Sequence, residues 1–377
     1  MRSSEVDMNL RLGCSGIKEG TAAASISLST AGVFAHEAKK LYAGGNMAYY
    51  TLPASMLLSL LIFVLLAKLI KRSGAGNLSE LICQSADRPT GIVITLLLFF
   101  ALIFSAYSPL SQFLKALHGL FFQGASYSRI LLYIMAPVLL ICFLGFETIA
   151  RTAKLLAVPL MIVFLSVIVS ASSDFEVYRL FPTAGGGLKS ILTQIFREVF
   201  TFLPAMISLL TVSDGLNGID SAIRIGAVSC LISAAVCAAA QLSVGLVFTY
   251  RQLNELFMPL FRINHLNKFE AHLMRMDKLA NIVWLNGAVL SASFYLYSAS
   301  RLFAGAFGLR DIRPAIAASV TITALMLLFE TETVDNTQFV RMSELIFRYG
   351  TVTAFPVLAA GILSAVRSEG RKKCGNS

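Results

Sequence analysis

Long stretches without a charged side chain recur along the whole sequence. Ten stretches of more than fourteen residues contain no Asp, Glu, Lys or Arg: 20–36, 41–67, 89–114, 130–146, 155–173, 199–213, 225–250, 279–300, 314–329 and 349–366. A bilayer core about 30 Å thick is crossed by about 20 helical residues, and charged residues at the ends of a stretch can reach the interface. The pattern therefore predicts ten transmembrane helices, numbered here as spans 1 to 10.

The composition agrees with a membrane protein. Apolar residues make up 56% of the 377 residues and charged residues 14%, and the mean hydropathy is +0.73. Soluble domains carry about 25% charged residues, so this chain has too few to cover a water-soluble globule. We therefore predict an all-α, multi-pass integral membrane protein. The net charge of +10 does not indicate a nucleic-acid partner, because the basic residues stand singly between apolar stretches, apart from a short cluster at 371–373.

The ten spans divide into two halves of five. Spans 1–5 occupy residues 20–173 as a first repeat, and spans 6–10 lie within residues 174–366 as a second. Lys and Arg slightly favour the side of both chain ends, so residues 1–19 and the tail 367–377 are predicted to be cytoplasmic. Because five is an odd number of crossings, the second half starts on the side of the membrane opposite to the first. Any repeat is therefore inverted. In transporters of this plan the substrate lies near the midplane, where the first helix of each half is interrupted.

Span 1 offers one half of a candidate substrate site. It is the least apolar of the ten and is rich in Ser, Thr, Ala and Gly. Gly32, which follows Thr30 and Ala31, could end one half-helix, and an unwound backbone there would present amide and carbonyl groups to an amino acid. Close packing of an ordinary helix explains the same composition. With that alternative open, Thr30, Ala31 and Gly32 are candidate substrate-binding residues.

Span 6 offers the other half. Its charge-free stretch is the shortest of the ten and contains Phe200, Thr201, Phe202 and Pro204. A proline inside a helix removes a backbone hydrogen bond, and in a membrane the freed groups need a neighbour or a ligand. A harmless kink is the alternative. We take these four residues as candidate substrate contacts, with the two phenylalanines as apolar walls.

The sequence carries no sign of enzyme chemistry. The serine hydrolase, zinc peptidase and phosphate-loop motifs are missing, and the six cysteines are scattered without a CxxC pair. We therefore expect no enzymatic activity, no catalytic residue, no metal site and no cofactor.

The junction of spans 4 and 5 carries a more specific pattern. Gly145, Glu147 and Arg151 stand in the run 144–153, and Glu147 and Arg151 are four residues apart, so they can pair on one helix face. The run resembles the Gly-x-Glu-Thr-Ile-Ala-Arg signature of the spore germination permease family, the B subunits of nutrient germinant receptors. Weaker similarities follow in order at 180–192, 200–202 and 275–284.

The resemblance implies a fold and a role. The fold would be that of the amino acid–polyamine–organocation superfamily, a leucine-transporter-like five-plus-five inverted repeat. The role would be to bind a small nutrient, typically an amino acid, in the inner membrane of the endospore, together with the receptor's A and C subunits. A secondary active amino acid transporter, coupled to H⁺ or Na⁺, is the alternative in the cell membrane. The sequence departs from the family at the end of span 1 and after the aromatic residues of span 6, where the ligand is expected.

Overall fold

Helices make up every regular element in the part of the chain that the structure describes. The computed structural model describes residues 15–34, 41–42, 45–85, 88–121, 124–184, 186–253, 256, 259–265 and 276–332. The long helices are α1 (Ile17–Phe34), α3 (Ala48–Ser73), α5 (Arg88–Ala116), α6 (Tyr127–Leu144), α7 (Phe146–Ala171), α8 (Gly187–Thr211), α9 (Ile219–Val247), α13 (Met276–Phe307) and α14 (Arg313–Glu332). Short helices join them: α4 (Leu78–Ser85), η1 (Leu117–Phe121), η2 (Ser172–Asp174), η3 (Val177–Leu180), η4 (Ser213–Leu216), α10 (Tyr250–Leu253) and α11 (Pro259–His265).

Eight of the described helices are long and apolar enough to cross a membrane. They are α3, α5, α6, α7, α8, α9, α13 and α14, and they coincide with predicted spans 2 to 9. The prediction of a multi-pass, all-helical membrane protein is thereby confirmed. Helix α1 covers most of predicted span 1 and is less apolar than the eight. Predicted span 10, at 349–366, lies outside the described residues.

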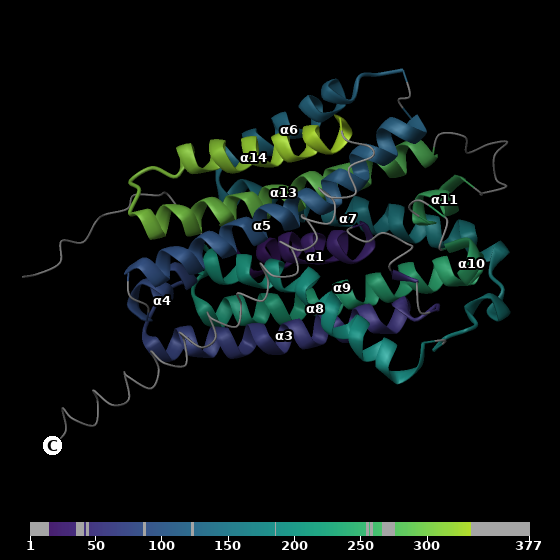
Figure 1. Cartoon of the computed structure of the whole chain (residues 1–377), viewed down its shortest axis with the longest axis horizontal. Coiled ribbons are helices and arrows are strands. Elements are labelled where there is room, and N and C mark those ends of the chain that lie inside the picture. The colour runs from purple at the N-terminus through teal and green to yellow at the C-terminus, as the bar shows by residue number, and fades with distance from the viewer. Residues whose placement is uncertain are drawn as a thin grey trace, which may run out of the picture.

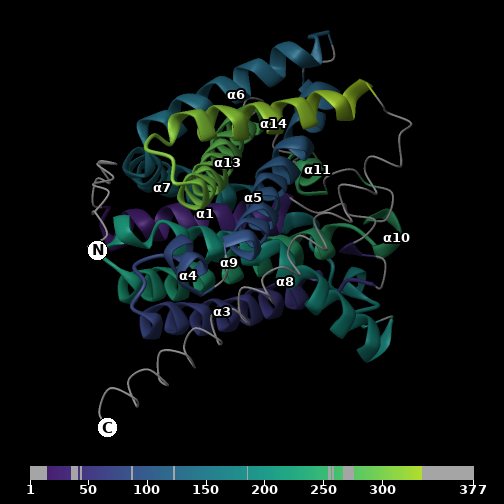
Figure 2. The same ribbon diagram turned by 60° about the vertical axis from the view of Figure 1, so that its left-hand side comes forward.

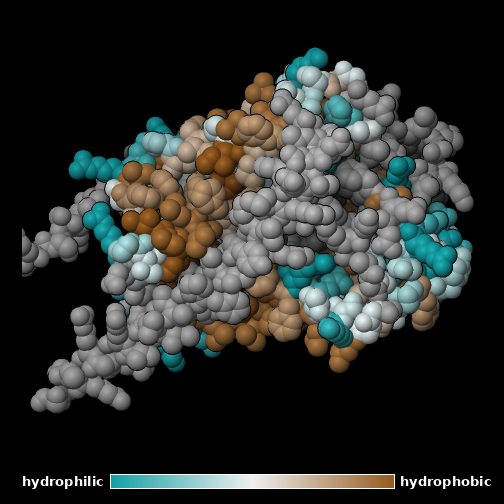
Figure 3. Space-filling model, viewed as in Figure 1, coloured by the Kyte–Doolittle hydropathy of each residue, from teal (hydrophilic) through white to brown (hydrophobic). Residues whose placement is uncertain are grey.

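The least apolar long helix lies inside the bundle. Figures 1 and 2 show α1 (purple) surrounded by the other helices, with α6 and α14 together at one edge and α3 at the opposite edge. Helix α1 packs chiefly against α9, α13 and α7, and also against α8 and α5. Figure 3 shows brown apolar side chains along the flank of the bundle and teal polar ones gathered mainly toward its ends, as expected for a protein that crosses a bilayer.

Serine hydroxyls on α9 hold it against the backbone of α1. Ser229 Oγ donates a hydrogen bond to the carbonyl oxygen of Thr21 at 3.1 Å, and Ser233 Oγ donates to that of Ser25 at 3.0 Å. Because water is excluded from the hydrocarbon core, a buried hydroxyl needs such an acceptor within the protein. Small side chains on both helices let the two backbones approach closely enough for these bonds to form.

The same arrangement joins α3 to α8. Ser55 Oγ donates to the carbonyl oxygen of Ile195 at 2.9 Å, and Ser59 Oγ donates to that of Val199 at 3.0 Å. Adding 174 to the numbers of the two α3 serines gives the two α9 serines. Adding 174 to the numbers of the two acceptor residues of α1 gives those of α8. Each half of the chain therefore supplies serines that bind the backbone of the other half's first helix.

The junction of α6 and α7 contains the predicted motif. Gly145 separates the two helices with φ +93° and ψ 175°, a conformation that is essentially restricted to glycine. Glu147 and Arg151 form an ion pair in the first turns of α7, and their side chains are 32% and 72% exposed. Exposed pairs of this kind stabilise a helix by only about 0.5 kcal/mol. The glycine is therefore the more important structural residue of the motif.

Gly145→Ala should lower the stability of the protein by about 1–3 kcal/mol, the typical cost of a side chain in this backbone region. A Cβ at residue 145 would meet no atom within 4 Å, so the loss would be conformational and not steric. Thermal unfolding in detergent measures the effect. Gly124→Ala is the matched control, because Gly124 also has open space around it but lacks a positive φ. Equal melting temperatures for the two variants would contradict the assignment.

Candidate functional site

A cavity runs along one face of α1. It has a volume of about 420 Å³, within the range of about 300–1,000 Å³ that is usual for small-molecule sites. The opposite walls come from α7, α9, α11 and α13. The α1 side carries Lys18, Thr21, Ser25 and Ser29, which recur every three or four residues and so share one helical face, and Thr30, which directly follows Ser29. A mainly apolar cavity thus has a row of hydroxyl groups on one side.

The hydroxyl groups of this row differ in their partners. Thr21 Oγ1 donates to the carbonyl of Ile17 at 2.7 Å, and Ser29 Oγ donates to Ser233 Oγ at 3.2 Å. Ser25 Oγ is buried and finds no hydrogen-bond partner among the described residues. An unsatisfied hydroxyl in a low-dielectric site is costly, so a polar atom of a bound molecule would stabilise it.

Four aromatic rings cluster at the Phe34 end of α1, and two of them, Phe34 and Trp284, line the cavity. Phe34 contacts Phe113 of α5, Phe261 of α11 and Trp284 of α13, with ring centroids 4.7, 5.7 and 5.6 Å apart. All four rings are at least nine-tenths buried. The rings meet at tilted or edge-on angles, which favours their association. The lining residues at this end are buried or, for Leu160, half-buried; we call this part of the cavity the aromatic chamber, lined by Thr30, Phe34, Leu160, Phe164, Trp284 and Gly287.

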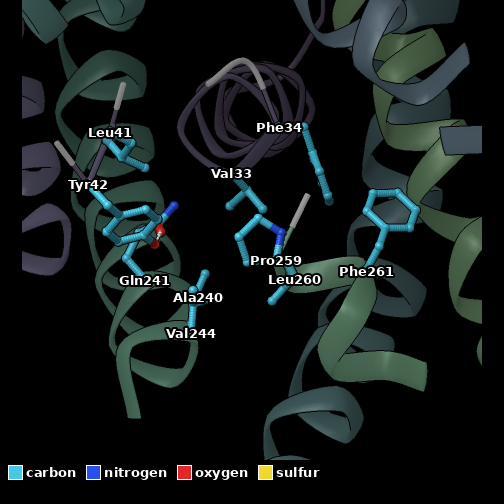
Figure 4. A pocket seen from close by; sticks show the side chains of 10 residues that line it. All are labelled: Val33, Phe34, Leu41, Tyr42, Ala240, Gln241, Val244, Pro259, Leu260 and Phe261. Carbon is cyan, nitrogen blue, oxygen red and sulfur yellow. Dashed lines mark hydrogen bonds between the residues drawn. The ribbon is translucent and has the colours of Figure 1, made fainter. Parts of the chain in front are cut away.

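A small second void adjoins the aromatic chamber. Figure 4 shows this pocket of about 30 Å³, enough for a water molecule or an ammonium group, between the end of α1, α9 and α11. Tyr42 OH donates to Gln241 Oε1, and Gln241 Nε2 donates to the carbonyl oxygen of Gly32 at 3.3 Å. The two voids share Val33, Phe34 and Leu260 as common walls.

The predicted residues of span 1 fall on different sides of α1. Thr30 lines the aromatic chamber, whereas Gly32 faces the α9 and α8 side. A Cβ built on Gly32 would lie 2.3 Å from Cys237 Sγ and 3.2 Å from Phe202 Cε1. Ala31 is buried in the core. The helix continues through Thr30, Ala31 and Gly32 to Phe34, so the expected interruption at Gly32 is corrected: this glycine serves close helix packing.

The predicted residues of span 6 are packed inside α8. This helix continues from Gly187 to Thr211 with Pro204 inside it, so the expected break at Pro204 is likewise corrected. Thr201, Phe202 and Pro204 are buried, and Phe200 is partly buried. None of the four lines either void. The structure therefore brings Phe202 together with Gly32 as packing partners and leaves only Thr30 of the seven candidates at the cavity.

Glu198 is a charged residue of α8 that the search for charge-free stretches excludes from span 6. The stretch of span 6 begins at 199, but the helix starts at Gly187 and carries Glu198 in its buried face. Its carboxylate pairs with Arg197 at 2.7 Å and accepts a hydrogen bond from Thr201 Oγ1 at 3.1 Å. Buried carboxylates in membrane helices are usually functional. The sequence signal that could have found Glu198 is the helical spacing of apolar residues, which extends the span-6 helix back across 187–198.

Comparison with known proteins identifies the family. Residues 53–336 match the sequence profile of the family described as "Spore germination protein". The match spans well over half of the chain, so this protein belongs to that spore germination permease family, and the predicted resemblance is confirmed. No curated protein matched the sequence.

Solved structures with a similar fold are transporters. A substrate-bound, outward-open Na⁺-coupled sialic acid symporter is 12% identical, with a TM-score of 0.65 over 92% of this chain and 78% of that one. Two structures of a manganese transporter from Eremococcus coleocola are 14% identical. One has a TM-score of 0.62 over 97% of this chain and 80% of that one, and the other, bound to an aromatic bis-isothiourea compound, has 0.60 over 92% and 78%. At these identities the likeness shows a transporter-like fold.

Gly32→Ala should destabilise the protein by about 1–3 kcal/mol, as is usual for overpacking, because the new methyl group would collide with Cys237 Sγ. Removing that sulfur relieves the collision. In a Cys237→Ala background the cost of Gly32→Ala should therefore shrink by at least half, which a double-mutant cycle of melting curves measures. An undiminished cost in that background would show that α1 and α9 do not pack as described.

Proposed function

We propose that this member of the spore germination permease family is the non-enzymatic B subunit of a nutrient-germinant receptor in the inner membrane of the endospore. The observation that carries the proposal is the aromatic chamber beside the central helix of a transporter-like fold. A small nutrient, and an amino acid in the first instance, would bind there. The partners would be the receptor's A and C subunits.

The chamber suits a small zwitterion with an apolar side chain. Thr30 Oγ1 offers a hydrogen bond, while Leu160, Phe164 and Trp284 offer apolar contact. The oxygen atoms of Tyr42 and Gln241 at the adjoining void would accept hydrogen bonds from an ammonium group. Charged side chains line the cavity only at its Lys18 end, so a net-neutral ligand matches the chamber better than an ion does.

Helix α1 is the element through which binding would act on the partners. It contacts five other long helices, and α9 is fastened to its backbone by Ser229 and Ser233. A ligand that binds one position of α1 more tightly than another shifts the population of the two states by that difference in affinity. The rearranged bundle would then present a changed surface to the A and C subunits.

The serine bonds also support the five-plus-five inverted repeat with ten transmembrane helices. The pairs α1–α9 and α3–α8 repeat the same donors and acceptors after 174 residues, with each half contributing one helix to each pair. Two halves related by a pseudo-twofold axis produce such reciprocal contacts. We accordingly propose residues 20–173 and 174–366 as the two repeats.

Glu198 favours a second function, a secondary active transporter coupled to H⁺ or Na⁺. It is a carboxylate buried in α8, and carboxylates of this kind serve as proton or cation sites in transporters. Uptake of radiolabelled amino acids into proteoliposomes distinguishes the two functions. A receptor should bind the amino acid without uptake above that of empty vesicles. A transporter should accumulate it under an H⁺ or Na⁺ gradient and lose accumulation in Glu198→Gln.

Gly287→Leu should fill the chamber and abolish nutrient binding in the purified protein. A Cβ at residue 287 would point between Leu160 Cδ2, at 3.3 Å, and Thr30 Oγ1, at 3.8 Å. We expect at least a tenfold loss of affinity for a panel of radiolabelled amino acids, with the same loss in spore germination. Gly124→Leu, at an exposed glycine with open space, is the control. Wild-type affinity in a folded Gly287→Leu protein would exclude the chamber as the site.

A further inference from the structure

The other half of the cavity opens to the outside of the bundle between α7 and α9. Helix α1 packs against both, while α7 and α9 make little contact with each other. Three of the residues lining this half are exposed: Val158 by 64%, Met161 by 36% and Ile232 by 39%. Because α7 and α9 both cross the membrane, the opening between them faces the hydrocarbon of the bilayer.

An apolar crevice in contact with hydrocarbon must be filled by hydrocarbon. Water does not enter the bilayer core, and an empty crevice forfeits the dispersion contacts of the atoms that line it. Small side chains at Ala22 of α1 and Ala157 of α7 keep the crevice open along the helix axis. An acyl chain has the required narrow, extended shape.

The mouth of this crevice is basic. Lys18 of α1 and Lys154 of α7 both line it, and both are exposed. Lys154 Nζ also pairs with Glu19 at 2.7 Å, and Glu147 and Arg151 pair with each other nearby. These five side chains carry one net positive charge. A basic pocket between membrane helices at the cytoplasmic surface, where this end is predicted to lie, attracts anionic lipid headgroups.

We propose that this crevice is a binding site for an anionic phospholipid. One acyl chain lies between α7 and α9 against α1, and the phosphate lies beside Lys18 and Lys154. The lipid occupies the open half of the cavity, and the nutrient proposed above would occupy the aromatic chamber. The lipid site does not depend on the germinant role, because it follows from the opening and the charge alone.

Trp284, in the adjoining aromatic chamber, is a built-in probe of the inner end of the acyl chain. It is the only tryptophan of the sequence, it is 4% exposed, and it lines the cavity. Bromine atoms quench tryptophan fluorescence only at short range, so brominated lipid surrounding the bundle reaches Trp284 poorly. The purified full-length protein is reconstituted into vesicles of phosphatidylglycerol or phosphatidylcholine with bromines near the chain end. We expect marked quenching in brominated phosphatidylglycerol. Diluting this lipid with unbrominated phosphatidylglycerol should lower the quenching more than dilution with unbrominated phosphatidylcholine, because only phosphatidylglycerol competes for the site.

Variants assign the quenching to the crevice. Ala157→Phe should fill the crevice and remove most of the quenching, whereas Val169→Phe, at a lipid-facing position of the same helix, should retain it. Lys18→Gln and Lys154→Gln should each lower the preference for phosphatidylglycerol by up to about fivefold. Absence of quenching in the wild type, or equal quenching in Ala157→Phe, would overturn the site. Equal quenching by both headgroups would overturn the role of the two lysines.

Discussion

The polarity of α1 is the constraint on which the rest of the structure depends. A helix rich in Ser, Thr and Gly is poorly suited to face lipid, so the other helices surround it. Burial in turn requires that its carbonyls and hydroxyls find partners without water. Ser229, Ser233 and Gln241 of α9 meet that need from one side. The hydroxyl row of α1 also borders the cavity, which we propose as the binding site.

The cavity changes character along α1, and this allows the two proposed occupants to share one space. At the Phe34 end, the cavity is bordered by the aromatic cluster and by the buried residues around Thr30. At the Lys18 end, the wall between α7 and α9 is incomplete and the mouth is basic. A nutrient in the chamber and a lipid in the crevice would both press on α1. Membrane composition would then bias the same helix that the nutrient moves.

Much of the fold was predictable because hydrocarbon imposes a simple rule on sequence. Charge-free stretches located spans 2 to 9, and the run around Gly145 and Glu147 indicated the family. The expected breaks in α1 and α8 were wrong, because Gly32 and Pro204 have packing partners that only the assembled bundle supplies. The walls of the chamber from α7 and α13 were also beyond prediction, since Leu160 and Gly287 carry no chemical signal of their own. Of the seven candidates only Thr30, noted for the unusual polarity of its span, lies at the cavity.

A cryo-electron microscopy map of the protein bound to an amino acid that it recognises tests the central claim most directly. The account predicts density for the amino acid beside Thr30 and Trp284, with α1 continuous through Gly32. Density at another place, such as between α3 and α8, or an α1 that unwinds at Gly32 to hold the ligand, would contradict it.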